Sequence, residues 1–70
     1  MDFRIQIGRN LRTHREGAGM TQLDLKLETG VATSEISRIE TGKRDPGVGT
    51  LLRLAEGLDV RVADLVEGLP

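Results

Sequence analysis

Apolar residues at helical spacing, interrupted at intervals by glycine, are the feature that most limits what this chain can fold into. Near the N-terminus they recur every three or four residues, which is the period of one face of an α-helix. This spacing predicts an amphipathic helix over residues 2–16, with an inward face formed by Phe3, Ile7, Leu11 and His14. Gly17 and Gly19 follow and end the helix.

A second, shorter helix is predicted between Thr21 and Gly30. Thr21 supplies a hydroxyl for the N-cap, and Asp24 follows three residues later, close to the pattern of a capping box. The leucines of this segment alternate as they would in a strand, at Leu23, Leu25 and Leu27. Because the segment is short and lies between a cap and a glycine, we expect a helix.

A third helix is predicted after the turn at Gly30. The hydroxyl of Thr33 or Ser34 can cap it, and it ends at Gly42. Its inward face is expected to contain Ile36 and Ile39.

Two further helices are predicted in the last third of the chain. Asp45 can cap and Pro46 can start the fourth, whose wide apolar face comprises Val48, Leu51, Leu52, Leu54, Ala55 and Leu58. A short fifth helix over residues 62–67 presents Val62, Leu65, Val66 and Leu69.

The length of 70 residues allows one small domain, because a chain of this size buries only about 60% of the surface that it exposes when unfolded. We therefore expect residues 1–70 to form a single domain. The absence of cysteine excludes disulfides and thiolate zinc sites. No apolar run approaches the roughly 18 residues of a membrane span. With no signal-peptide or lipidation pattern, we expect a cytoplasmic protein that makes no contact with a membrane.

The charge is unevenly divided, although ten basic and eleven acidic residues nearly cancel over the whole chain. Residues 1–44 contain eight basic and six acidic residues, whereas residues 45–70 contain two and five. The first part is thus net positive and the last part net negative. This division is compatible with one face that binds an anion and another end that binds a different partner.

The two short helices around Gly30 have a known use in recognition. In a helix-turn-helix the second helix protrudes and enters the major groove of DNA, which is wide enough for an α-helix. Gly30 supplies the left-handed backbone conformation that such a turn needs. The side chains expected on the exposed face of the second helix are polar: Thr33, Ser34, Ser37 and the longer Arg38.

The order and spacing of these residues resemble the Cro/repressor-like (XRE-type) helix-turn-helix family from about Ile7 to Leu65. The resemblance is carried by Leu11-Arg12, Arg15, Thr21-Gln22, Leu25, Gly30-Val31, residues 36–40, Gly42-Lys43, Pro46, Leu51-Leu52, Leu54-Ala55 and Leu58. It implies an all-α, compact, five-helix fold like that of phage repressors, with the helix-turn-helix at helices 2 and 3. It also implies a sequence-specific DNA-binding regulator of transcription, bacterial or phage-encoded, that is usually a homodimer on a palindromic operator.

The resemblance also implies roles for individual residues. Gln22 looks like the family's phosphate-contacting glutamine, and Arg38 reaches either a guanine edge or a phosphate. The expected DNA-binding set is Gln22, Thr33, Ser34, Ser37, Arg38, Lys43 and Arg44. Arg15 and Glu40 resemble the family's structural ion pair. Glu35 either accepts a hydrogen bond from cytosine, repels wrong sequences, or lies on an ordinary solvated surface.

The C-terminal apolar residues exceed what one short terminal helix can bury, which indicates a partner surface. We therefore expect a homodimer interface formed by Val62, Leu65, Val66 and Leu69. The alternative, from a different functional class, is an antitoxin-like protein that binds another protein through its acidic C-terminal part. A further alternative is the DNA-binding part of a longer regulator with a sensor domain.

Catalytic signatures do not appear in the sequence. It has neither a glycine-flanked nucleophile, nor a phosphate-binding glycine loop, nor an adjacent pair of metal-binding carboxylates. The single histidine, His14, is expected to be an ordinary packed or surface side chain. We therefore expect no enzyme, no metal and no cofactor.

Overall fold

A computed structural model describes residues 2–70 of the chain, and these residues form five α-helices and no strand. The helices are α1 (Phe3–Gly17), α2 (Gln22–Thr29), α3 (Thr33–Glu40), α4 (Val48–Leu58) and α5 (Val62–Leu65). The expected all-helical, five-helix fold is confirmed. Within residues 2–70, no helix combines the length and the apolar character that crossing a membrane requires.

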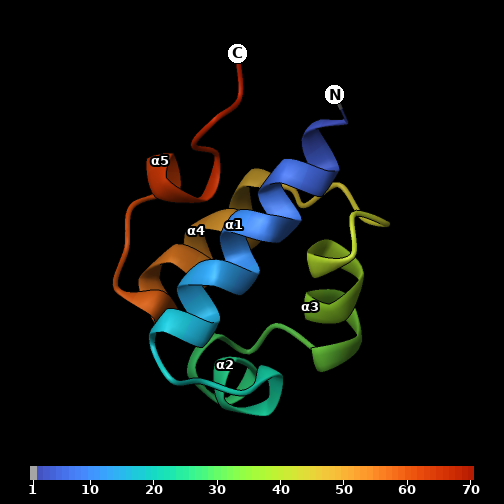
Figure 1. Cartoon of the computed structure of the whole chain (residues 1–70). Coiled ribbons are helices and arrows are strands. Elements are labelled where there is room, and N and C mark those ends of the chain that lie inside the picture. The colour runs from blue at the N-terminus through green and yellow to red at the C-terminus, as the bar shows by residue number, and fades with distance from the viewer. Residues whose placement is uncertain (1) are drawn as a thin grey trace.

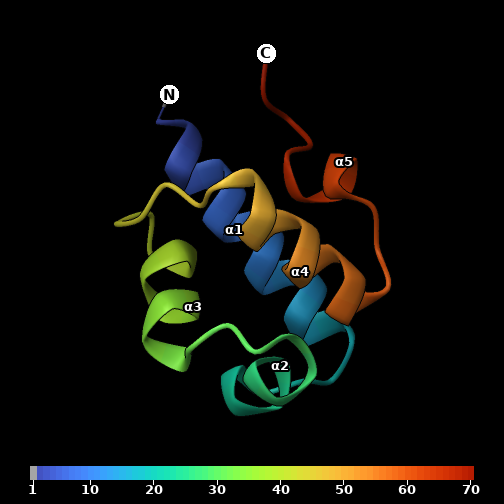
Figure 2. The same cartoon turned by 180° about the vertical axis from the view of Figure 1, so that it is seen from behind.

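The two longest helices, α1 and α4, cross the middle of the molecule, and the shorter helices surround them (Figures 1 and 2). Helix α3 packs beside α1, while α2 packs against both α3 and α4. The short α5 packs against α1 and α4, and both ends of the chain emerge on the side opposite α2 (Figure 1). The helix-turn-helix therefore lies on one side of a frame formed by α1 and α4.

One apolar core holds all five helices together. Its fully buried members come from every helix and are Leu11, Leu25, Ile36, Ile39, Leu54 and Leu65. Met20, Val60 and three residues near the C-terminus pack around this core while remaining partly exposed. The prediction that Phe3 faces inward is wrong: Phe3 is 45% exposed, and Ile7, one turn later, is the first residue of α1 in the core.

Helical geometry explains why two leucines of α2 and part of the predicted apolar face of α4 are exposed. Leu23 and Leu27 lie two residues from buried Leu25, and two residues along an α-helix correspond to about 200° of rotation, so they point away from the core. Val48 and Leu52 are also exposed, which corrects their assignment to the inward face of the fourth helix. The core face of α4 is a narrower stripe, formed by Leu51, Leu54, Ala55 and Leu58.

Three predicted helix boundaries were wrong. The N-cap of α3 is Ala32, which makes no side-chain cap, and Thr33 is already helical. Helix α4 begins at Val48 with Gly47 as its N-cap, whereas Pro46 is buried and lies before the helix. The last helix ends at Leu65, where the next residue leaves the helical conformation.

Helices α1 and α3 approach each other closely at Gly8. A Cβ at Gly8 would clash with the carbonyl oxygen of Ile39 and lie 2.8 Å from that of Glu40. Only glycine permits this approach, which brings the end of α3 directly against α1. The position of α3 is thus fixed by backbone contact as well as by buried side chains.

Candidate nucleic-acid interface

Helix α2 begins with the predicted capping box. The hydroxyl of Thr21 accepts a hydrogen bond from the N–H of Asp24 at 3.0 Å, and the Asp24 carboxylate accepts from the N–H of Thr21 at 2.8 Å. The bond from the Thr21 N–H, followed by the bond with its side chain, lowers the pKa of Asp24 below its ordinary value. The start of α2 is thereby fixed as a charged cap.

The turn between α2 and α3 depends on Gly30, which has a left-handed backbone with φ of 76°. The N–H of Gly30 donates to the carbonyl of Lys26 at 2.7 Å. Thr29 supports the same turn, because its hydroxyl donates to the carbonyl of Leu25 at 2.7 Å and accepts from the N–H of Val31 at 3.1 Å. These bonds set the angle at which α3 leaves α2.

A nearly buried ion pair fastens the end of α3 to the rest of the molecule. Arg15 of α1 donates to both carboxylate oxygens of Glu40, from Nε at 2.6 Å and from Nη2 at 3.0 Å, and from Nη1 to the carbonyl of Met20 at 2.8 Å. The side chains of Arg15 and Glu40 are only 11% and 3% exposed. The hydrogen bonds that Arg15 donates to Glu40 raise the pKa of its guanidinium above its ordinary value.

Gln22 lies at the first turn of α2, where its amide joins this network. One N–H of its Nε2 donates to Oε1 of Glu40 at 3.3 Å. A side-chain amide has two N–H groups, so the second remains able to donate to another acceptor. Gln22 is thus oriented by the same carboxylate that binds Arg15, a connection that the sequence did not indicate.

The outer face of α3 brings together four polar side chains from two segments. Ser34, Glu35 and Arg38 of α3 and Arg44 of the following connection line a hollow of about 110 Å³. Arg44 donates from Nε to Glu35 at 3.1 Å. This pair links residues nine positions apart across a connection without regular structure, so no periodicity in the sequence could have revealed it.

The other residues predicted to bind DNA lie nearby in the chain. Thr33 and Ser37 are half-buried on α3, whereas Lys43 is exposed in the connection to α4. The backbone N–H of Lys43 donates to the carbonyl of Arg38 at 2.9 Å, which holds the start of this connection close to the last turn of α3. The candidate interface therefore consists of α3, the connection after it and the start of α2.

The apolar residues near the C-terminus are more buried than a dimer surface would require. The side chain of Leu65 is 0% exposed because it fills the core between α1 and α4, which corrects its assignment to a surface. Val62, Val66 and Leu69 are half-buried and lie against that core. Asn10 of α1 secures this segment, since its side-chain amide donates to the carbonyls of Leu65 at 3.0 Å and Glu67 at 2.8 Å.

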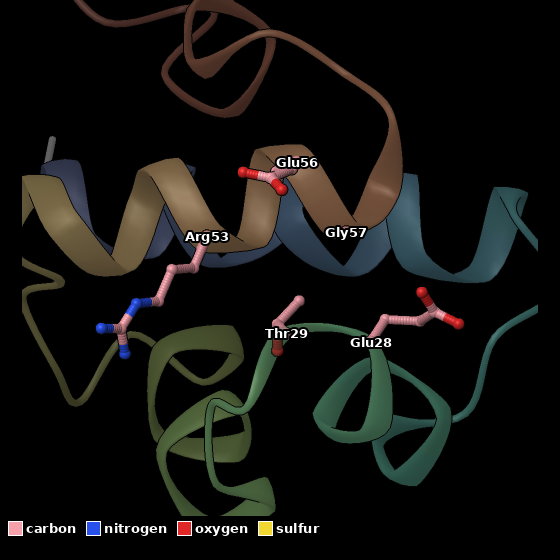
Figure 3. A pocket seen from close by; sticks show the side chains of 5 residues that line it. All are labelled: Glu28, Thr29, Arg53, Glu56 and Gly57. Atoms are coloured by element: carbon pink, nitrogen blue, oxygen red, sulfur yellow. The ribbon is translucent and has the colours of Figure 1, made fainter.

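A second hollow of about 170 Å³ lies between α2 and α4, away from the outer face of α3 (Figure 3). Charged side chains surround it, and its lining residues are Glu28, Thr29, Arg53, Glu56 and Gly57. A Cβ at Gly57 would clash with the methyl group of Thr29, so this glycine allows α2 and α4 to approach. In the described part of the chain, no group of three His, Asp or Glu side chains is placed to hold a metal ion.

Comparisons with known proteins agree with this arrangement. The family described as "Helix-turn-helix" (HTH_3) matches residues 11–65. Among curated proteins, the uncharacterized HTH-type transcriptional regulator y4dJ of Sinorhizobium fredii (strain NBRC 101917 / NGR234) is 36% identical over 66 residues, which cover 94% of this chain and 86% of y4dJ. The regulator y4dL of the same strain is 39% identical over 56 residues, 80% of this chain, although the match spans only 29% of y4dL.

A similar solved structure is the restriction-modification controller protein C.AhdI from Aeromonas hydrophila. It superposes with a TM-score of 0.86 at 29% sequence identity, over 89% of this chain and 94% of that chain. The similarity therefore extends over the whole arrangement of helices that positions the outer face of α3.

Proposed function

The chain belongs to the helix-turn-helix family and is a DNA-binding regulator of transcription, and from this premise we propose that it acts as a homodimer on a palindromic operator. The observation that carries the proposal is the outer face of α3. There, the hydroxyl of Ser34 and the guanidinium groups of Arg38 and Arg44 surround one hollow on a helix that the Arg15–Glu40 pair holds in place. We further propose that the protein acts in the cytoplasm, without enzymatic activity of its own.

The proposed contacts fall into two classes. Gln22, Lys43 and Arg44 flank α3 and bind phosphates, because the start of a helix and exposed basic side chains both attract anions. Thr33, Ser34, Ser37 and Arg38 lie on α3 itself and meet base edges in the major groove. In this proposal Gln22 uses its second amide N–H, while Glu40 holds the first.

The proposed dimer forms through the C-terminal segment. Val62, Val66 and Leu69 each expose part of an apolar side chain, and Leu52 adds apolar surface on α4, against which α5 packs. A two-fold contact places two copies of α3 about 34 Å apart, in successive major grooves on one face of the DNA. Two recognition helices would then read enough base pairs to select an operator.

Selection and footprinting test this function directly. The whole chain is incubated with a randomised duplex library, and the enriched duplex is footprinted. The expected result is protection of two inverted half-sites about one helical turn apart. Absence of enrichment would overturn DNA binding by sequence, whereas one asymmetric half-site would overturn the dimer and favour a different protein as the partner of the C-terminal segment.

A further inference from the structure

One basic side chain on the proposed DNA-binding face forms an ion pair within the protein. Glu35 lies in the first turn of α3, and Arg44 lies in the connection between α3 and α4. Their 3.1 Å contact ties this connection to the helix. The two side chains remain 32% and 51% exposed, so both are accessible to a ligand at the surface.

A phosphate and the Glu35 carboxylate compete for the same guanidinium. Glu35 binds only Nε of Arg44, so the other N–H groups could reach a phosphate, but that phosphate would then lie close to the Glu35 carboxylate. If the guanidinium turned fully to the phosphate, Glu35 would carry an unpaired negative charge close to the DNA backbone. An exposed ion pair is weak enough to be broken, but like charges at close range oppose the arrangement that results. The gain from the phosphate contact is therefore offset unless Glu35 obtains another partner.

We propose that Glu35 determines specificity by withholding Arg44 from the phosphates of unrelated DNA. This inference rests on the proposed function and concerns the same surface. On the operator, the amino group of a cytosine in the major groove donates a hydrogen bond to Glu35, which releases Arg44 for a phosphate. On unrelated DNA no such donor meets Glu35, so Arg44 stays bound to it.

The position of Glu35 favours this role over that of a general surface charge. It lines the hollow together with Ser34, Arg38 and Arg44, so its carboxylate, which binds Arg44, shares this hollow with a second arginine in the region proposed to enter the groove. Glu28 offers a matched comparison, because it is an exposed glutamate beside the other hollow, between α2 and α4 (Figure 3). Its removal changes the net charge equally but leaves the outer face of α3 intact.

The test compares affinities of the whole chain for two duplexes. One is the duplex that the wild-type protein enriches from the library, and the other has the same length and composition in scrambled order. Fluorescence anisotropy is measured between about 50 mM and about 200 mM salt. Glu35→Gln is expected to raise affinity for the scrambled duplex roughly threefold to fivefold and to steepen its salt dependence by about one phosphate contact. The ratio of selected to scrambled affinity falls, whereas Glu28→Gln leaves it unchanged.

A double-variant cycle shows whether Glu35 acts through Arg44. In an Arg44→Ala background, Glu35→Gln is expected to have no further effect on the scrambled duplex. An equal gain in that background, or an equal change from Glu28→Gln, would overturn the inference by showing that charge alone matters. So would a Glu35→Gln variant with the same ratio of affinities as the wild-type protein, when the wild-type protein binds its selected duplex. Failure of the wild-type protein to bind either duplex overturns the proposed function as well. Circular dichroism verifies that each variant is folded.

Discussion

Arg15 and Glu40 are joined by two hydrogen bonds across the contact between α1 and α3, and Glu40 also accepts one from Gln22. A single carboxylate therefore connects α1, α2 and α3. Removal of Glu40 would leave the Arg15 guanidinium buried without its counter-charge. Glu40→Ala is thus expected to lower the free energy of unfolding by about 3 kcal/mol, measured by urea denaturation.

A surface ion pair on α1, the helix that contains Arg15, provides the control for this prediction. Arg12 and Glu16 lie one turn apart with a 3.4 Å contact, and both side chains are more than half exposed. Glu16→Ala is expected to change the unfolding midpoint very little, because exposed pairs are worth less than about 1 kcal/mol. Equal effects of Glu16→Ala and Glu40→Ala would show that burial does not strengthen the Arg15 pair.

The close contact at Gly8 predicts a strong effect of a single methyl group. Gly8→Ala would force the Ile39 and Glu40 carbonyls away from α1, at a cost of about 1–3 kcal/mol. Gly17 is the matched position on α1, since a Cβ there meets nothing within 4 Å. Gly17→Ala is expected to be neutral or to stabilise by up to about 1 kcal/mol. Thermal unfolding of both variants would contradict this account if Gly8→Ala proved the more stable.

The capping box at the start of α2 predicts how the free energy of unfolding depends on pH. The pKa of Asp24 is lowered from 3.8 in the folded chain, so the unfolded state takes up the proton first as pH falls. The contribution of Asp24 is therefore present above its unfolded pKa of 3.8 and is lost as pH falls through the lower folded value. Asp24→Asn keeps an oxygen acceptor for Thr21 but no charge that titrates. Urea denaturation below pH 5 is expected to show a weaker pH dependence for this variant, and identical curves would contradict the assignment.

Affinities for the selected and the scrambled duplex distinguish residues that contact bases from residues that contact phosphates. Arg38→Ala is expected to weaken binding to the selected duplex by roughly 1–3 kcal/mol and to weaken binding to scrambled DNA less. Lys43→Ala is expected to lower the affinity for both duplexes similarly and to reduce the slope of log affinity against log salt concentration by about one. Equal losses on both duplexes for Arg38→Ala would make Arg38 a phosphate contact.

The dimer proposal predicts distinct effects of acidic substitutions on two apolar surfaces. Leu52→Asp and Leu69→Asp should each shift sedimentation towards the monomer and abolish joint occupancy of two half-sites. Leu27→Asp on α2 is the control, since Leu27 is 75% exposed and lies outside the proposed interface. A chain that already sediments as a monomer at the concentration that protects DNA would contradict the homodimer.

The sequence was sufficient to predict the helices whose signals are local. Glycine at position 30 and the Thr21 and Asp24 spacing predicted α2 and the turn after it, because capping and left-handed turns depend on neighbouring residues. The pair of Arg15 and Glu40 came from a resemblance, since residues 25 positions apart have no local signal. The structure contains this pair.

The errors arose where tertiary packing decides the outcome. Leu65 was expected on a surface because its apolar neighbours were judged too many for one short terminal helix to bury, but this side chain is completely buried between α1 and α4. Pro46 is buried and lies outside α4, which starts two residues later than the sequence signal at Pro46 predicts. The pair of Glu35 and Arg44 depends on how one irregular connection folds back, which no pattern of spacing encodes.

The hydrogen bonds from Asn10 to residues 65 and 67 affect when the core can close during synthesis. Its two hydrogen bonds join residues 55 and 57 positions apart, and Leu65 fills the core beside them. Such long-range contacts form late in folding, because nearly the whole chain must close into a loop. On the ribosome the first four helices therefore emerge with an unfilled core. Emergence of residues 65–67 from the exit tunnel, rather than appearance of the helix-turn-helix, sets the moment at which the core between α1 and α4 is filled.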